Sequence, residues 1–317
     1  MLHIDRILVP RDFSSTSNRA VQYAIDWAER TGAELHVIHA KVLHQKRDES
    51  IIDRERENMK RLRKRLGQVD GEAVATDVEL VEAVVRDVAP APAILDYADE
   101  NDIDLIIMGT HGRRGMRRIL MGSVAAEVVR YADSPVLTVR GTETDLTEAP
   151  DPIKTIGVPV DLSDHSREAL QHGAAAADML GAALFVHHVI EDTLHPAFYV
   201  GGVSSVKDAD PNIEKKVQKE LDAFVEKSLH APPYNTVDVR TRVDVAARAS
   251  RIIPRVAEEE GVDLLTMATH GRTGGREFRL GSVIEKVVRH VSCPVLTVKV
   301  HGRSLLGTSE ATDEATA

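Results

Sequence analysis

The sequence predicts two tandem α/β domains, each built around a doubly wound, five-stranded parallel sheet. Its 317 residues suffice for two domains of ordinary size, each with a core of its own. The sequence also repeats itself once along its length. Within each repeat, short runs rich in Val, Ile and Leu alternate with longer helical patterns, which is typical of βαβ units around a buried parallel sheet.

The repeat is found by aligning the chain with itself. ILVPRDFS near the start matches IGVPVDLS, so that Pro10 corresponds to Pro159 and Asp12 to Asp161, each 149 positions apart. Further along, GTHGRRGMRRILMGSV matches ATHGRTGGREFRLGSV, and SPVLTVR matches CPVLTVK, now 159 positions apart. Copy two therefore carries a net insertion of ten residues, which we place in the loop-like segment 191–211.

The elements of copy one follow in order, and copy two is expected to repeat them. We predict strands at residues 6–9, 34–39, 74–81, 105–108 and 136–139, and helices at 16–30, 53–66, 91–100 and 124–131. The first domain spans residues 1–142, a linker rich in turn and charged residues spans 143–152, and the second domain spans 153–300. The small, polar tail at 301–317 is predicted to be disordered.

Composition excludes several classes of function. No apolar run approaches the roughly 20 residues that span a bilayer, and the first residues lack the features of a secretory signal, so we expect a cytoplasmic protein with no membrane partner. The net charge of −10 and the 3% of aromatic residues argue against binding of nucleic acid. The single cysteine, Cys293, forms no internal disulfide or thiolate metal site and is predicted to be a small buried residue, not a nucleophile.

Polar and glycine-rich segments recur at the ends of the first and fourth strands, where the strand order of a doubly wound sheet reverses and ligands bind. Asp12 and Asp161 end the first strands; either carboxylate is suited to a ribose hydroxyl, or it caps the following helix. After the fourth strand of copy one come Gly109, Gly112, Gly122 and Ser123. Glycines allow a polyanion to approach the backbone, and a helix start with a hydroxyl favours phosphate; a loop with glycines only for its turns is the alternative.

Taken together, the VPxD strand end, the GAELHVIHA second strand, the G-x2-G-x9-G-S loop and the closing PVLTV strand resemble the universal stress protein family, along almost the whole of both copies. The resemblance implies a Rossmann-like sheet with strand order 3-2-1-4-5 and, in the nucleotide-binding branch, ATP between strands one and four. Asp12 would contact the adenosine, the backbone of Ala40 would meet the adenine edge, and the loop glycines with Ser123 would hold the phosphates. The corresponding positions of copy two are listed together: Asp161, Val189, Ala268, Gly271, Gly281 and Ser282.

The chain departs from the family pattern at several positions. Ala268 replaces the first glycine of the loop in copy two, which puts nucleotide binding there in doubt. Val88 and Ala247 stand where the family tends to have glycine, and Arg11 stands at a usually apolar position, reaching either the pocket or the solvent. Arginines crowd the loop spacer of both copies and either screen phosphate charge or form a solvated basic loop. The histidines of the second strands, His36, His39, His187 and His188, are interpreted as structural, not as metal ligands.

The leading functional hypothesis is an ATP-binding stress-response protein, a nucleotide-dependent regulator with at most slow hydrolysis and with Mg²⁺ held through the phosphates. No G-x4-G-K-[ST] loop is present, and no nucleophile stands beside a base, so no catalytic residue is assigned. One alternative is an interaction or scaffold protein of the same fold. Another, less favoured, is an adenine-nucleotide hydrolase or adenylating enzyme, whose usual loop after strand one is missing here.

The assembly of the two copies is also suggested by the resemblance. Single-domain relatives commonly pair through their last strands, and the PVLTV segment occurs here at both 135–139 and 294–298. We therefore expect the two copies to pair within one chain as a pseudo-dimer, with a further homodimer as an open alternative.

Overall fold

A computed structural model describes residues 2–12, 14–42, 57, 60, 62, 78–110, 121–140, 150–192, 205–230, 234–271 and 280–307. In copy one the elements are β1 (Arg6–Pro10), α1 (Ser15–Thr31), β2 (Glu34–Val42), β3 (Leu80–Asp87), α3 (Pro90–Glu100), β4 (Leu105–Gly109), α4 (Ser123–Tyr131) and β5 (Val136–Val139). In copy two they are β6 (Thr155–Val160), α5 (Asp164–Leu180), β7 (Ala183–Glu191), α6 (Val206–Ala209), α7 (Ile213–Leu229), η2 (Tyr234–Thr236), β8 (Val239–Ala246), α8 (Ala249–Glu259), β9 (Leu264–Ala268), α9 (Ser282–His290) and β10 (Val295–Val298).

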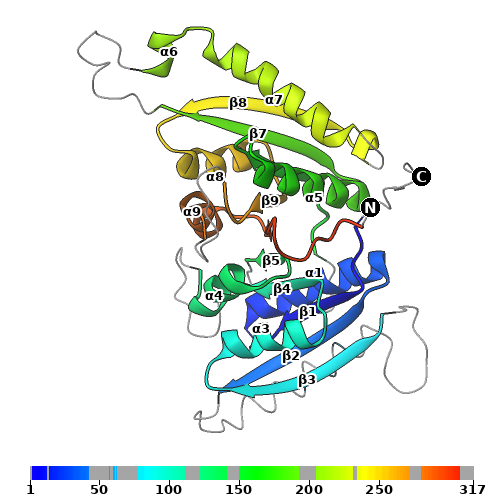
Figure 1. The fold of residues 1–317 in the computed structure, drawn as a ribbon. Helices are drawn as coiled ribbons and strands as arrows, with labels where there is room; N and C mark the ends of the chain where they lie inside the picture. The colour runs from blue at the N-terminus through cyan, green and yellow to red at the C-terminus, as the bar shows by residue number, and fades with distance from the viewer. Residues whose placement is uncertain are drawn as a thin grey trace, which may run out of the picture.

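The ten strands form one sheet in the order β3-β2-β1-β4-β5-β10-β9-β6-β7-β8. Each half has the order 3-2-1-4-5 with parallel neighbours, as expected for a doubly wound sheet. The halves join through β5 and β10, which pair antiparallel with Leu137 opposite Leu296. The expected pairing of the two PVLTV segments is therefore present, and Figure 1 shows the two copies stacked along the sheet on either side of this junction.

The third strand was misplaced in the sequence analysis. It runs from Leu80 to Asp87, so that Leu80 and Val81 are the only described residues of the predicted range 74–81 that lie in it, although Val78 is buried against the core. Residues 74–77 lie outside the described part. The segment alternates apolar and polar residues on both sides of Leu80, and β3 is an edge strand whose Val84 is 48% exposed, so alternation alone did not fix its register.

The insertion of copy two lies where it was expected, between β7 and the helix that precedes β8. The offset between copies is still 149 at the start of β7, and it is 159 at the start of β8, since Glu34 corresponds to Ala183 and Leu80 to Val239. Leu62 of copy one and Leu221 of α7 are 159 positions apart, and both are fully buried. The change of offset from 149 to 159 is therefore complete before Leu221. The remainder of the helix predicted at 53–66 lies outside the described residues, apart from helical positions at 57, 60 and 62.

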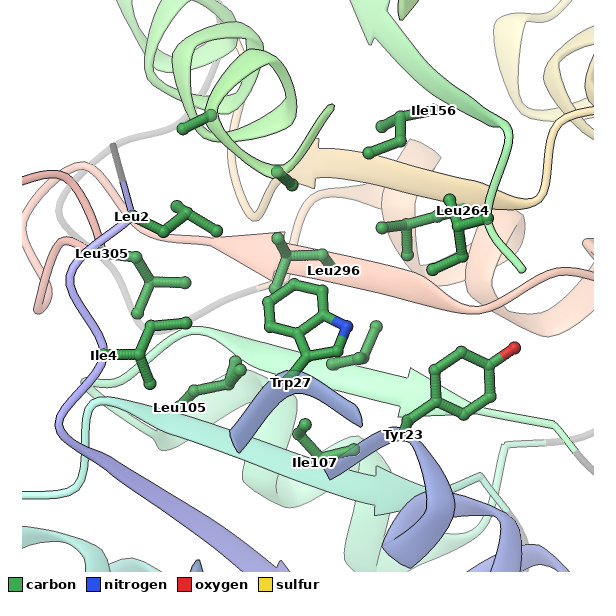
Figure 2. Close-up of a cluster of buried hydrophobic side chains, with 14 of the residues drawn as sticks. Leu2, Ile4, Tyr23, Trp27, Leu105, Ile107, Ile156, Leu264, Leu296 and Leu305 are labelled. Atoms are coloured by element: carbon green, nitrogen blue, oxygen red, sulfur yellow. The ribbon is translucent and has the colours of Figure 1, made fainter. Parts of the chain in front are cut away.

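One hydrophobic core continues from one copy to the other. On the face of the sheet covered by α1 and α5, fully buried Trp27 lies among Leu105 and Ile107 of copy one and Leu296 of copy two, as Figure 2 shows. The same cluster extends to Ile156 and Leu264. On the opposite face each copy has a smaller cluster of its own: cluster A under α3 and α4, and cluster B under α8 and α9. Burial of the shared core on the face covered by α1 and α5 therefore stabilises the two copies as a single body.

Part of the predicted disordered tail is ordered. Residues 301–307, which we call the C-terminal strap, return from β10 along copy one, where the Arg303 amide donates to the Asp133 carbonyl (2.9 Å) and its guanidinium to Asp102 (2.8 Å). Leu305 is fully buried in the shared core, and Leu2 and Leu306 form an antiparallel bridge. The prediction failed because Leu305 and Leu306 find their apolar partners on distant parts of the chain. Residues 308–317 lie outside the described part.

Candidate functional site at the strand ends

The carboxylates that follow β1 and β6 hold the first turn of the next helix. Asp12 Oδ1 accepts hydrogen bonds from the Ser14 amide (3.1 Å) and the Ser14 hydroxyl (2.6 Å). Ser14 is itself the N-cap of α1 and accepts from the Ser17 amide. Copy two repeats the arrangement with Asp161, Ser163 and Ser166. The alternative in which the aspartate itself caps the helix is therefore wrong: serine is the cap, and the aspartate orients it.

In copy two, the loop after β9 closes against this carboxylate. A Cβ built on Gly271 would lie 2.5 Å from Asp161 Oδ2, so a side chain at Gly271 would force the carboxylate to move. The absence of a side chain thus lets the ends of β6 and β9 approach each other at the switch point. Gly112, the corresponding residue of copy one, lies outside the described residues, as do His111 and the arginines of both loop spacers.

The last glycine of each loop is the N-cap of the helix that follows it. Gly122 precedes α4 and donates its amide to the Thr110 carbonyl (2.7 Å), and Gly281 precedes α9 and donates to the Thr269 carbonyl (2.9 Å). Ser123 and Ser282 follow these N-caps as the first helical residues. Neither N-cap makes a side-chain hydrogen bond, so the helix starts present backbone amides suited to an anion.

The first glycine of the loop has a packing role. A Cβ on Gly109 would lie 2.9 Å from the carbonyl carbon of Thr16 and 3.1 Å from the amide of Ser17, at the start of α1. Gly109 is therefore required by the close approach of α1 to the end of β4. This packing role is neither the phosphate contact nor the turn considered from sequence, and Ala268 shows that copy two accommodates a methyl group at the same register position.

Ala40 and Val189 lie near the carboxyl ends of β2 and β7, opposite Val85 and Asp244 in the neighbouring strands. Next to each is a histidine that ties the second strand to the end of the first. His39 Nδ1 lies 2.8 Å from the Arg11 carbonyl, and His188 Nδ1 lies 2.8 Å from the Val160 carbonyl. These contacts confirm a structural role for His39 and His188 and bring Ala40 and Val189 beside the strand ends that carry the aspartates.

Arg11 does not reach the solvent, one of the two destinations considered from sequence. Its side chain is only 3% exposed, and Nη2 donates to Asn18 Oδ1 in the first turn of α1 (2.7 Å). The remaining second-strand histidines are also bonded within the fold, His36 to the Tyr97 hydroxyl (2.9 Å) and His187 to Asp244 (3.0 Å). Burial lowers the pKa of His187, against the opposing effect of Asp244. Burial raises the pKa of the Cys293 thiol to about 12, which agrees with its predicted inert role.

Copy two gathers three histidines beside its strand ends, and two of them were missed by the sequence analysis. The ring of His165, in the first turn of α5, lies 6.4 Å from that of His270 and 6.5 Å from that of His301, between ring centroids. His165 corresponds to Thr16 of copy one, and this difference between the copies was the available signal. Within the described ranges, no group of three or more His, Cys, Asp or Glu side chains is arranged to hold a metal ion.

Val88 and Ala247, where the family tends to have glycine, are both exposed, Val88 at 69%. Their side chains therefore point to solvent. In the part of the chain that the structure describes, no helix is both long and apolar enough to cross a membrane.

These features define a class: a tandem α/β protein with two switch points, each carrying an aspartate and a helix start whose N-cap is a glycine. The model of the universal stress protein family matches residues 3–140 and 152–299, so the chain belongs to this family, in a tandem form. Among curated relatives it is 32% identical over 146 residues to Universal stress protein MJ0531 of Methanocaldococcus jannaschii, covering 43% of this chain and 81% of that protein. It is 24% identical over 301 residues to a universal stress protein of Mycolicibacterium smegmatis, covering 92% and 96%.

Solved structures agree with the tandem fold. A putative universal stress protein from Pseudomonas aeruginosa superposes with a TM-score of 0.65 at 17% identity, covering 93% of each chain. A universal stress protein from Archaeoglobus fulgidus gives a TM-score of 0.61 at 19% identity, covering 95% of this chain and 97% of that one.

Proposed function

We propose that this protein binds ATP at the switch point of copy one and acts as a nucleotide-dependent regulator in a stress response. The supporting observation is that Asp12 follows β1, while the neighbouring strand β4 leads to α4, whose N-cap Gly122 makes no side-chain hydrogen bond. A carboxylate there suits ribose hydroxyls, and the amides of a helix start suit phosphate.

In this proposal each residue except Gly109 keeps the role given by the family resemblance. Asp12 receives the ribose, the backbone of Ala40 lies along the adenine edge, and Gly112, Gly122 and Ser123 hold the phosphates, with Mg²⁺ carried on the phosphate oxygens. Gly109 instead allows α1 to pack closely against the end of β4. The packed surface then forms one wall of the proposed nucleotide site. The side chains assigned to the site include no nucleophile with an adjacent base, so any hydrolysis of ATP is slow.

Copy two offers a second, altered site. Asp161, Gly271 and Gly281 correspond in sequence to Asp12, Gly112 and Gly122, beside Val189 and Ser282, whereas Ala268, His165 and His301 are particular to copy two. The two sites are therefore expected to differ in affinity, with copy one the tighter.

The test is the nucleotide content of the purified protein, followed by calorimetric titration of ATP and Mg²⁺ into stripped protein. We expect a single tight ATP per chain, lost in Gly122→Val with folding intact by circular dichroism. Gly281→Val makes the same change at the matched position of copy two and should retain the tight site. If the wild-type protein carries no adenine nucleotide and gives no binding heat, the proposal is wrong and a scaffold of the same fold is the better interpretation.

A further inference from the structure

The two helices that begin at the glycine loops are each held at their carboxyl ends by the other copy. Arg140, just after β5, donates from Nη2 to the Val288 carbonyl of α9 (2.9 Å) and also to the Arg289 carbonyl. Lys299, at the equivalent position after β10, donates from Nζ to the Arg130 carbonyl of α4 (2.9 Å). Cations at the carboxyl end of a helix satisfy its last carbonyls and interact favourably with its dipole.

The starts of the same helices also reach across the junction. Met121 immediately precedes the N-cap of α4, and Leu280 immediately precedes the N-cap of α9. Both side chains are partly buried, and each packs against cluster A of copy one as well as cluster B of copy two. Cluster B contains Ile284, Val287 and Val288 of α9, so Met121 touches the same apolar body to which α9 belongs.

We therefore propose that nucleotide occupancy of one copy is transmitted to the loop-flanked helix of the other through Met121, Leu280, Arg140 and Lys299, which we call the reciprocal clamp. This inference rests on the proposed function, because the signal is the arrival of a nucleotide at the start of α4 or α9. It goes beyond that function by making the two sites energetically coupled.

The physical reason is that α4 and α9 are short and fixed at both ends. Each helix has nine residues, so a phosphate that attracts the amides at the start of the helix shifts the helix as a whole. Met121 then moves against cluster B and the Arg130 carbonyl moves against Lys299, both of which belong to copy two. A densely packed interior transmits such a shift and does not absorb it.

Partial burial of Arg140 and Lys299 makes their contacts suited to transmission. Burial lowers the pKa of Arg140 and that of Lys299, Lys299 despite the opposing charge of Asp133. Breaking the hydrogen bond between a partly buried cation and its carbonyl partner costs free energy, so each cation and its helix move together.

The experiment is hydrogen exchange read by mass spectrometry on the full chain, with and without ATP and Mg²⁺. It uses the Gly281→Val background, in which the site of copy two is blocked, so that any change in α9 originates in copy one. We expect ATP to slow exchange of the amides of α4 directly and those of α9 on the order of fivefold, within the usual range of coupling between sites. Arg140→Met, added to this background, should abolish the effect on α9 and leave that on α4, and Arg140→Lys should restore it.

The outcomes separate the two proposals. If ATP protects neither helix, the proposed function fails. If ATP protects α4 but not α9, or if Arg140→Met leaves protection of α9 unchanged, the reciprocal clamp is wrong while the nucleotide site stands. Should Arg140→Met fail to fold, Leu280→Ala in the same background removes the apolar part of the clamp and is expected to lower the protection of α9.

Discussion

At the scale of single residues, the two copies use the same position in different ways. Gly109 and Ala268 end equivalent strands, and each lies opposite the last residue of the neighbouring strand, Val139 and Val298. In copy one the main chain of Thr16 fills the space that a Cβ would need, whereas copy two carries the Cβ. A glycine that looked like a phosphate contact is therefore also a packing requirement, set by a helix 93 positions earlier in the chain.

This difference predicts an asymmetric response to substitution. Gly109→Ala should lower the free energy of unfolding by about 1–3 kcal/mol, the usual cost of overpacking, because the start of α1 must move. Ala268→Gly makes the reverse change in copy two and should cost only about 0.5–1 kcal/mol, from added backbone freedom. Chemical denaturation of the two variants beside the wild-type protein measures both values. Equal losses in the two variants would contradict a packing role particular to Gly109.

At the scale of elements, the polar residues after β1 and β6 serve the start of a helix. Ser14 accepts from the Ser17 amide, while Asp12 fixes the Ser14 hydroxyl, and the same pair recurs as Ser163 and Asp161. The aspartate thereby stands at the strand end, where it holds the capping serine in place.

The cap of α1 can be tested with its counterpart as control. Ser14→Ala should lower the free energy of unfolding by about 0.5–2 kcal/mol, because the Ser17 amide loses its acceptor and Asp12 loses a donor. Ser163→Ala should cost a similar amount, since the geometry is the same. Urea denaturation followed by circular dichroism gives both values. A loss smaller than the experimental error in both variants would show that these serines do not cap their helices.

Sequence reasoning located most elements but not the contacts between them. The strands near 6–9, 34–39, 105–108 and 136–139 were correct because most of their residues are apolar and buried. The edge strand β3 was misplaced because a half-exposed strand tolerates alternation in either register. The role of Gly109 and the cluster of His165, His270 and His301 were missed because they depend on residues far apart in sequence.

At the scale of the whole molecule, the C-terminal strap joins both copies. Its Leu305 amide donates to His172 Nε2 of α5 (3.1 Å), and its Leu305 carbonyl accepts from the His3 amide (2.7 Å). His172 is 1% exposed, and its other ring nitrogen, Nδ1, lies 2.9 Å from the Glu168 carbonyl. Since Nε2 acts as an acceptor, this arrangement requires the neutral imidazole.

The pH dependence of stability follows from this histidine. Burial lowers the pKa of His172 below its usual value of about 6.5, against the opposing hydrogen bond and charge of Glu168. The unfolded chain therefore binds the proton first, so the stability is complete above about pH 6.5 and falls as the pH decreases below it. The lowered pKa of His187 acts in the same direction.

His172→Gln should flatten this pH dependence in part, because a glutamine oxygen can accept from Leu305 without titrating. The measurement is the free energy of unfolding of the variant and the wild type, from denaturant titrations at about pH 7.5, about pH 6.5 and about pH 5.5. The residual slope should disappear when His187→Gln is added. An unchanged slope in the His172 variant would exclude His172 as a source of the acid sensitivity.

The bridge between Leu2 and Leu306 has a consequence for biosynthesis. On the ribosome β1 emerges long before the segment that covers its beginning. Copy one can form its parallel strand pairs on the way, whereas Leu2 has no partner in Leu306, and Leu305 cannot fill the shared interior, until residues 301–307 have emerged. The bridge therefore closes only after the strands of both copies have been translated, and a nascent chain that stalls before Leu305 leaves an apolar surface for chaperones to cover.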